Sequence, residues 1–181
     1  PARLGAVLAA AASQGPRASL ALLYGAVTRL LGFREGEEGK VTGLAALGEP
    51  SRACSRLARF VRADGGQMVL DMRSAVAAAR RAVQAGDTRQ DVAADVQAAV
   101  THAALAWARH WLAHAGLRHL AVAGGLFANV SLNGALLTSG CETLTVCPAM
   151  GDQGLCVGAA LAVCGDAASQ PWRTLRLGPT I

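Results

Sequence analysis

The feature that most limits how this chain can fold is a repeated pattern of strand, glycine turn and helix between residues 118 and 164. The apolar segment RHLAVA leads into Gly124-Gly125, and the apolar segment TLTVC leads into the turn PAMGDQG. Helices are expected after each turn, over residues 127–137 and 155–164. This alternation predicts an α/β fold with a parallel pair of strands. Because parallel strands end at one edge of a sheet, both turns should meet at the edge where α/β folds bind ligands.

Upstream of this unit, apolar residues recur at helical spacing. Ser19 is a suitable cap for the first helix, and Gly32 and Gly116 are suitable stop signals for the first and last of these helices. We expect helices over residues 19–32, 51–62, 73–85 and 87–115, a short strand over 67–71, and a loop with a short helical turn over 33–50. The longest helix should bury one stripe, formed by Val92, Val96, Val100, Ala103, Trp107 and Trp111.

Composition excludes several classes of function. With 52% hydrophobic residues in 181, the chain can form one domain or part of a larger one. Its net charge is +5, but the arginines are dispersed, Lys40 is its single lysine, and no basic stripe with aromatic residues occurs. Every apolar run is broken well before the roughly 18 residues that a membrane span requires. We therefore expect neither nucleic acid nor a membrane as a partner.

The cysteines indicate the compartment. There are five, an odd number, with no C-x-x-C spacing, and most lie within apolar runs. This pattern favours buried, reduced thiols and a cytoplasmic location. The five residues are Cys54, Cys141, Cys147, Cys156 and Cys164.

The first turn has the composition of an anion site. Gly124 and Gly125 let the backbone approach a phosphate without a Cβ in the way, and the following helix would point unpaired N–H groups at the same place. Asn129 and Asn133 are four residues apart, so they share a helical face, and either could bind a phosphate, a ribose hydroxyl or a carbamoyl group. The alternative is a tight turn with solvent-facing asparagines. The segment is neither a dinucleotide G-x-G-x-x-G signature nor a P-loop.

The second turn adds a carboxylate. Gly151 and Gly154 allow a tight turn, and Asp152 is the only acidic residue between Glu142 and Asp166. A single carboxylate at a strand end suits a hard cation or a phosphate-bound metal. Capping of the following helix is the alternative role for Asp152.

Three segments together resemble a known family. They are LLYGAVTRLLGFREGEEGKVTGLAALGEP, HLAVAGGLFANVSLN and VCPAMGDQGLCVGAALAV, and the match as a whole covers about residues 19–163, with a divergent patch over 51–91. In order and spacing they are similar to the bacterial O-carbamoyltransferases of nodulation and antibiotic tailoring. The resemblance implies a transferase domain like that of the tRNA threonylcarbamoyl-adenosine transferases, with the short parallel strands and covering helices of the second lobe of an actin- and sugar-kinase-like ATPase fold.

The resemblance also implies ligands and roles. In this family carbamoyl phosphate and ATP give a carbamoyl-adenylate, and the carbamoyl group then passes to a hydroxyl of a small-molecule or saccharide acceptor. By position, Asp152 corresponds to a metal ligand, the metal being iron or another divalent transition metal. No residue of this chain is matched to a catalytic role, and a homo-oligomer stays open. The residues matched to nucleotide and phosphate binding are Lys40, Gly43, Gly124, Gly125, Asn129 and Gly151.

The chain departs from the family pattern in places. The family's histidine ligands lie in an H-x-x-x-H element upstream of the matched region, and Leu47 stands where many relatives have tyrosine. His110 and His114 repeat that spacing. However, they lie on the long helix beside two tryptophans without a third ligand nearby in sequence, so we do not assign them to the metal. The closing RLGPTI resembles the entry to the family's adenylate-forming domain.

The expected organisation is therefore partial. Residues 1–165 should be the C-terminal lobe of a carbamoyltransferase domain, and residues 166–181 a linker towards an adenylate-forming domain. A chain without the histidine pair and that domain is expected to be inactive alone. Two other readings stay open: a non-catalytic ATP-binding module of the same superfamily, and an interaction protein whose alanine-rich helices pack on a partner.

Overall fold

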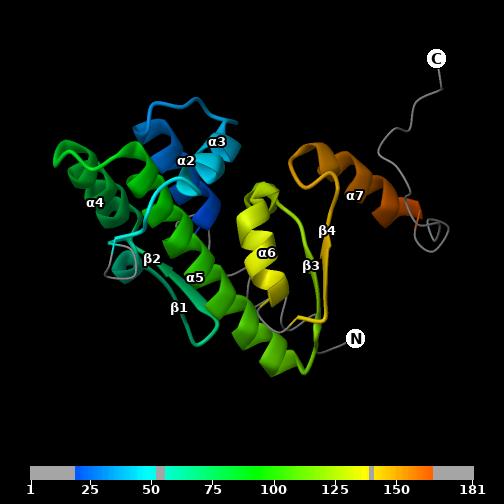
Figure 1. Ribbon diagram of the computed structural model, residues 1–181. Coiled ribbons are helices and arrows are strands. Elements are labelled where there is room, and N and C mark those ends of the chain that lie inside the picture. Colours follow the sequence, from blue (N-terminus) through cyan, green and yellow to red (C-terminus); the bar gives the residue numbers. More distant parts are fainter. Residues whose placement is uncertain (1–18, 52–55, 139–140, 165–181) are drawn as a thin grey trace, which may run out of the picture.

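The computed structural model describes residues 19–51, 56–138 and 141–164, and shows a mixed α/β chain (Figure 1). Its α-helices are α2 (Leu20–Leu30), α3 (Glu38–Ala45), α4 (Met72–Gln84), α5 (Arg89–Ala115), α6 (Val130–Thr138) and α7 (Gln153–Cys164). Its strands are β1 (Val61–Asp64), β2 (Gln67–Leu70), β3 (His119–Val122) and β4 (Thr143–Val146). The described residues also include the short 3₁₀ helices η2 (Ala58–Phe60) and η3 (Gly125–Ala128).

Helix α5 is the axis of the described structure. Helices α2, α3 and α4 and the β1–β2 hairpin pack against it (Figure 1). The predicted stripe is confirmed where the core is densest, since Val92, Val96, Val100 and Ala103 are at most 2% exposed. Trp107 and Trp111, further along the helix, are half-buried. Ala93, Ala99 and Ala104 are buried as well, because small side chains let the surrounding elements approach α5 closely.

The predicted helix ends are confirmed. The Ser19 hydroxyl accepts a hydrogen bond from the N–H of Leu22 at the start of α2, and Gly32, with φ of 82°, follows its end. Gly116 ends α5 in the left-handed conformation, with φ of 64°. Over residues 33–50 the helical part is longer than the single short turn expected, because α3 has eight residues.

One predicted helix is wrong. Val61 and Arg62, expected in a helix over 51–62, belong to β1, which pairs antiparallel with β2 in the register Val61↔Leu70. Residues 52–55 of that prediction lie outside the described residues. The hairpin turn is Gly65-Gly66, and both glycines have positive φ, as tight hairpins require. Pairing across this turn overrides the helical preference of the preceding segment, while the strand predicted over 67–71 is confirmed as β2.

The parallel pair is confirmed. Strands β3 and β4 run parallel in the register His119↔Thr143 and Val122↔Val146. Leu120 and Leu144 point towards the core, which α6 helps to close with its buried Leu132 and Leu136. The helix predicted over 127–137 is two elements, η3 and α6. This unit carries both glycine turns at the carboxyl end of its strands.

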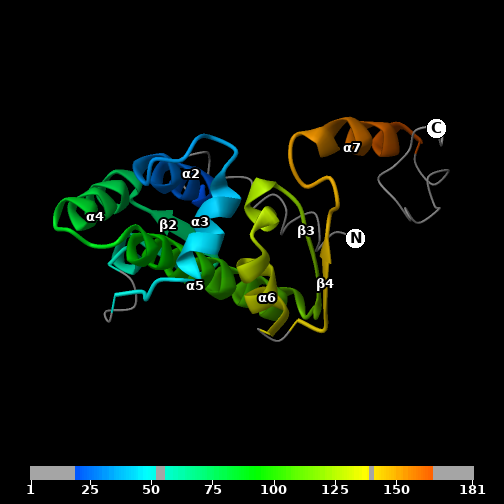
Figure 2. The ribbon, with the colours of Figure 1, turned by 45° about the horizontal axis from the view of Figure 1, so that its top comes forward.

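Helix α7 is confirmed but differs in environment from the other helices. Figure 2 shows it beyond β3 and β4, away from α2–α5, and none of its residues with a described burial is buried. The expectation of buried thiols is therefore wrong for Cys156 and Cys164, which are exposed, although it holds for Cys141, which is buried. Cys147 is half-buried, and Cys54 lies outside the described residues. In the described ranges, no helix combines the length and apolar character needed to cross a membrane.

Candidate functional site

The two predicted turns lie side by side at the carboxyl end of the parallel strands. The N–H of Cys147 donates to the carbonyl of Val122 at 2.9 Å, which continues the strand pairing beyond β4. The N–H of Gly124 then donates to the carbonyl of Met150, also at 2.9 Å. The structure therefore brings Gly124 and Gly125 next to the turn that carries Gly151 and Asp152.

The backbone of the first turn requires glycine. Gly124 has φ of 104° and ψ of 153°, a conformation that essentially only glycine adopts. It is exposed, and a Cβ built on it would meet no atom within 4 Å. Gly125 begins η3 immediately after it and is also exposed. Because the first N–H groups of a helical turn have no acceptor within the helix, this turn offers donors on an open surface.

The second turn leads directly into α7. The carbonyl of Gly151 accepts from the N–H of Gly154 at 2.9 Å, and that of Asp152 accepts from the N–H of Leu155 at 3.1 Å. Asp152 is exposed. A Cβ on Gly154 would lie 2.0 Å from the carbonyl oxygen of Ala149, so the tight turn predicted for this position depends on glycine. The backbone that carries Asp152 is thus tightly folded next to the first turn.

Asn129 lies under the first turn, buried at 7% exposure. Its Oδ1 accepts from the N–H of Leu132 at 3.0 Å, and its backbone is extended, so Asn129 caps α6. The amides of Asn129 and Gln97, the latter on α5, also pair with each other. Nδ2 of Asn129 donates to Oε1 of Gln97 at 2.8 Å, and Nε2 of Gln97 donates to Oδ1 of Asn129 at 3.2 Å. Direct phosphate contact by Asn129 stays a prediction; the bonds in the structure use its amide to hold the turn.

A partly buried polar network extends from Asn129 to α3. The phenol of Tyr24 donates to Oε1 of Gln97 at 2.9 Å and lies 2.9 Å from the hydroxyl of Thr42. Since the phenol has one proton, the Thr42 hydroxyl is the donor in the second bond. Burial raises the pKa of Tyr24 above its ordinary value, while the bond with Thr42 acts in the opposite direction.

Lys40 and Gly43 flank Thr42 on α3, and both are exposed. The Lys40 ammonium pairs with Glu37 at 2.7 Å and lies 6.0 Å from the ring centre of Phe33. The bond from Lys40 is the main reason that the pKa of the Glu37 carboxyl is lowered. No described contact joins Lys40 or Gly43 to the two turns directly. Their helix α3 is connected to the first turn by the hydrogen bonds that run from Thr42 through Tyr24 and Gln97 to Asn129.

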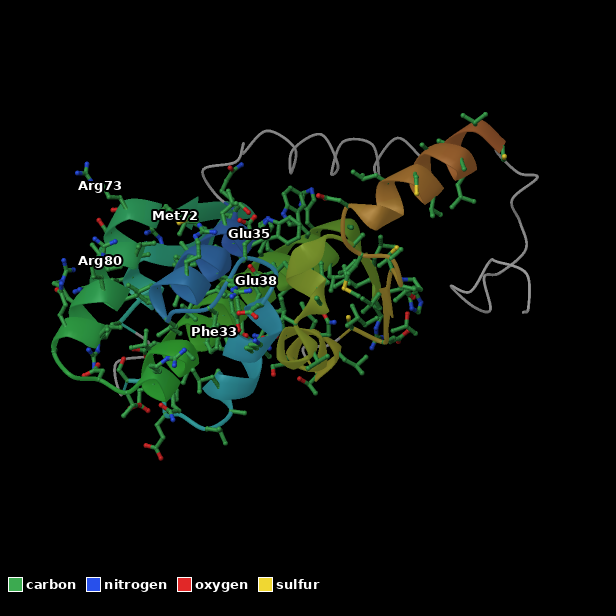
Figure 3. All side chains as sticks on the ribbon, turned by 90° about the horizontal axis from the view of Figure 1, so that it is seen from above. Phe33, Glu35, Glu38, Met72, Arg73 and Arg80 are labelled. Carbon is green, nitrogen blue, oxygen red and sulfur yellow. The ribbon has the colours of Figure 1, made fainter. Side chains whose placement is uncertain are left out.

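The arginines of α4 lie elsewhere. Figure 3 shows Arg73 and Arg80 projecting outward from α4, on the side of the molecule away from α7, while Phe33 and Glu38 lie near α3. These cationic groups therefore do not contribute to the surface around Gly124 and Asp152.

The spaced histidines have a packing role. The rings of His110 and His114 are stacked, with centroids 6.2 Å apart, in the last turns of α5. Trp111 between them donates to the carbonyl of Gly66 at 3.1 Å, and a Cβ on Gly66 would lie 2.6 Å from His110. Both histidines precede β3, whereas Asp152 follows β4, so they belong to opposite ends of the sheet. Across the described ranges, no three His, Cys, Asp or Glu side chains come together as a metal site.

Sequence reasoning missed Tyr24, Thr42 and Gln97. Two signals were present. Tyr24 is the only tyrosine of the chain and sits in an apolar helix, and Gln97 interrupts the alanine- and valine-rich face of α5. A lone polar side chain within a buried stripe must find a hydrogen-bond partner, and here the partners come from α2, α3 and the η3–α6 turn.

Known proteins share this sequence pattern. The family model described as the N-terminus of carbamoyltransferases matches residues 7–161. The chain is 34% identical to nodulation protein NolO of Bradyrhizobium diazoefficiens over 171 residues, covering 90% of this chain and 31% of that protein. It is 31% identical to nodulation protein NolNO of Sinorhizobium fredii over 157 residues, covering 82% of this chain and 23% of that protein. An uncharacterized protein of Synechocystis is 32% identical over 166 residues, covering 80% of this chain and 27% of the relative.

Proposed function

The chain belongs to the carbamoyltransferase family, and we propose that it forms the phosphate- and metal-binding lobe of an O-carbamoyltransferase. It spans less than a third of the length of each of the relatives above. In the proposed reaction, a carbamoyl-adenylate made from carbamoyl phosphate and ATP is attacked at its carbamoyl carbon by a hydroxyl of a small molecule or saccharide. The bond to the adenylate oxygen breaks, AMP leaves, and the hydroxyl loses its proton. The lobe would have the actin- and sugar-kinase-like ATPase fold.

The observation that carries this proposal is the hydrogen bond between Gly124 and Met150. It places a glycine turn with open N–H donors beside a turn with an exposed carboxylate, both at the carboxyl end of parallel strands. Oriented N–H groups stabilise the negative charge of a phosphate, and they do so without reorganising during the reaction. This pairing of donors and carboxylate is what a metal-assisted transfer from a nucleotide requires.

Each residue then has a proposed task. The N–H of Gly125 would orient the adenylate phosphate, while Gly124, whose own N–H is bonded to Met150, would let the phosphate approach the backbone without a Cβ in the way. Gly151 would keep the second turn tight beside it. Asn129 would support this turn from below. Lys40 and Gly43 would lie along the nucleotide, and the exposed Lys40 ammonium would add a positive charge. Release of Lys40 from Glu37 would accompany nucleotide binding, because one ammonium cannot fully pair with both groups.

Metal binding at Asp152 fits a site in which the protein supplies one ligand and the bound phosphate and water supply the others. A single exposed carboxylate beside a phosphate turn can hold a divalent ion jointly with phosphate and water, as Mg²⁺ sites commonly do. A transition metal such as iron would need further ligands, which the described residues do not bring to Asp152. When bound, a metal would supply Lewis-acid stabilisation of phosphate charge. The protein's own part is to hold the carboxylate and the N–H donors in place.

Nucleotide binding is tested by titrating the chain with ATP in the presence of Mg²⁺ or Mn²⁺. We expect binding that Asp152→Asn weakens and that Glu142→Gln, an exposed carboxylate at the start of β4, leaves unchanged. Transfer is tested with labelled carbamoyl phosphate, ATP and a panel of hydroxyl acceptors, using a polypeptide that carries this chain at the length of its relatives. Absence of metal-dependent binding, or of any carbamoylated product, would contradict the proposal.

A non-catalytic ATP-binding module of the same superfamily is the second candidate. It is favoured because the described residues bring together no three His, Cys, Asp or Glu side chains that could hold a metal for the transfer step. This candidate predicts ATP binding that carbamoyl phosphate does not affect and no transfer in the longer polypeptide. The 181-residue chain alone is expected to show no turnover under either candidate, so its transfer of carbamoyl groups to any acceptor would contradict both.

A further inference from the structure

Gln97 occupies a central position behind the candidate site. It lies on α5 and uses both ends of its amide. Its Oε1 accepts from Nδ2 of Asn129 at 2.8 Å and from the Tyr24 phenol at 2.9 Å, and its Nε2 donates to Thr101 at 3.0 Å and to Oδ1 of Asn129 at 3.2 Å. One side chain therefore contacts α2, α5 and the η3–α6 turn.

The bond to Asn129 acts on the first glycine turn. Asn129 lies between η3, which spans Gly125–Ala128, and α6, which begins at Val130. Within this segment the Asn133 amide donates to the carbonyl of Phe127 at 2.8 Å, whereas the bonds from Gln97 tie the segment to α5. The Asn129 side chain caps α6, and Gln97 holds that side chain against α5 through two bonds. A side chain held by two bonds has one orientation, so the cap and the turn before it have one position relative to α5.

The bond to Tyr24 acts on α3. The phenol is 4% exposed and receives a hydrogen bond from Thr42, which lies between Lys40 and Gly43 on α3. Two successive hydrogen bonds, from Thr42 to Tyr24 and from Tyr24 to Gln97, therefore connect α3 to α5. The two parts of the candidate site that share no direct contact are related through the Gln97 amide. The Asn129 side chain also acts directly on Tyr24, since burial raises the pKa of the phenol and the hydrogen bond with Asn129 acts in the opposite direction.

We propose that Gln97 is a positioning residue for the candidate site, which fixes the glycine turn through Asn129 and α3 through Tyr24. The expected effect of Gln97 on ligand binding rests on the proposed function. Its effect on the positions of the glycine turn and of α3 is independent of that function. Gln97 is not expected to touch the ligand.

The ligand-free test is amide hydrogen exchange of the chain with Gln97→Met, which keeps the length of the side chain and removes its bonds. We expect exchange in residues 124–132 and 38–45 to accelerate about tenfold, with the amides of α4 unchanged. Gln84→Met, an exposed glutamine at the end of α4, is the matched control and should change neither region. Uniform acceleration in all helices, or no acceleration in the two regions, would overturn the proposal.

If Gln97→Met does not fold, Gln97→Glu is the second variant. It keeps the acceptor for Tyr24 and Asn129 and replaces Nε2 by a carboxylate oxygen. That oxygen can accept from the Thr101 hydroxyl but cannot donate to Oδ1 of Asn129, so the donated bond to Asn129 is lost. The same two regions should accelerate, residues 124–132 more than 38–45, because the donated bond to Asn129 is lost while the bond from Tyr24 is kept. Equal acceleration in both regions, or none, would contradict the assignment.

A double-mutant cycle tests whether Gln97 acts through Asn129. Gln97→Met and Asn129→Ala should each weaken ATP affinity about tenfold, and the double variant should bind no more weakly than Asn129→Ala alone. Additive losses, or unchanged affinity in Gln97→Met, would overturn the positioning role. If the unmodified chain does not bind ATP, the proposed function fails, and the hydrogen-exchange result still decides the role of Gln97.

Discussion

The amide of Gly124 and the carbonyl of Met150 are joined by a hydrogen bond of 2.9 Å, and this bond unites two turns that are 26 residues apart in the sequence. It extends the pairing of β3 and β4 past the end of both strands. The donors of the first turn and the Asp152 carboxylate of the second consequently share one surface.

Gly124→Ala should destabilise the chain by about 1–3 kcal/mol, because its backbone conformation is essentially restricted to glycine. No steric clash contributes, since a Cβ there would meet nothing within 4 Å. Gly125→Ala is the matched control, because a Cβ at Gly125 would also meet no atom within 4 Å and Gly125 does not have a positive φ. This substitution should change the free energy of unfolding by less than about 0.5 kcal/mol. Urea unfolding of the two variants compares them, and equal losses would show that Gly124 is not strained.

Tyr24 should ionise above the ordinary range of about pH 10, because burial raises the pKa of its phenol. A group with a raised pKa in the folded state stabilises fully below its unfolded pKa and loses that contribution as the pH rises through the folded value. Since Tyr24 is the only tyrosine, phenolate absorbance reports it alone. Tyr24→Phe should remove that signal and flatten the alkaline decline in stability. A phenol that titrates below its ordinary pKa would contradict the buried network.

Asp91 should stabilise the chain at neutral pH and lose this effect in acid. The Thr88 hydroxyl and then the N–H of Glu49 donate to its carboxylate and lower the pKa of Asp91. Because the pKa of Asp91 is lower in the folded state, Asp91 stabilises the fold at any pH above its unfolded pKa of about 4. This stabilisation is lost as the pH falls from there towards the folded pKa. Asp91→Asn should therefore flatten the acid limb of a stability–pH profile. Asp64→Asn, which removes an exposed carboxylate next to the turn of the β1–β2 hairpin, serves as the charge-matched comparison.

Leu132→Ala should cost about 2–5 kcal/mol, because Leu132 on α6 is fully buried where that helix closes the core behind the glycine turn. Leu155→Ala on α7 removes the same atoms from a side chain that is 71% exposed and should cost less than about 0.5 kcal/mol. Chemical unfolding monitored by tryptophan fluorescence compares them. A large loss in Leu155→Ala would show that α7 is packed in solution.

Much of the local structure could be predicted because its causes lie within a few residues. Ser19 and Gly32 bracket α2, Gly116 ends α5 with a positive φ, and the change from helical to alternating periodicity marks β3 and β4. The two glycine turns and their meeting at one sheet edge follow from the same local pattern, since a parallel pair places both ends together.

The predictions that failed depended on distant contacts. Val61 and Arg62 form a strand because the glycine turn at Gly65-Gly66 folds them onto β2, which no helical periodicity reveals. The thiols of Cys156 and Cys164 are exposed because α7, although apolar, has no buried residue among those described. An apolar sequence shows that a segment can be buried, and only the surrounding elements determine whether it is.

The sequence alone determined the α/β pattern, the glycine turns and the family, because each depends on residue types at short, fixed spacings. Only the tertiary structure placed Tyr24, Thr42 and Gln97 together behind Asn129, and paired Lys40 with Glu37. The reason is physical: buried polar groups must be hydrogen-bonded, and which partners they find is decided by how four elements pack around α5.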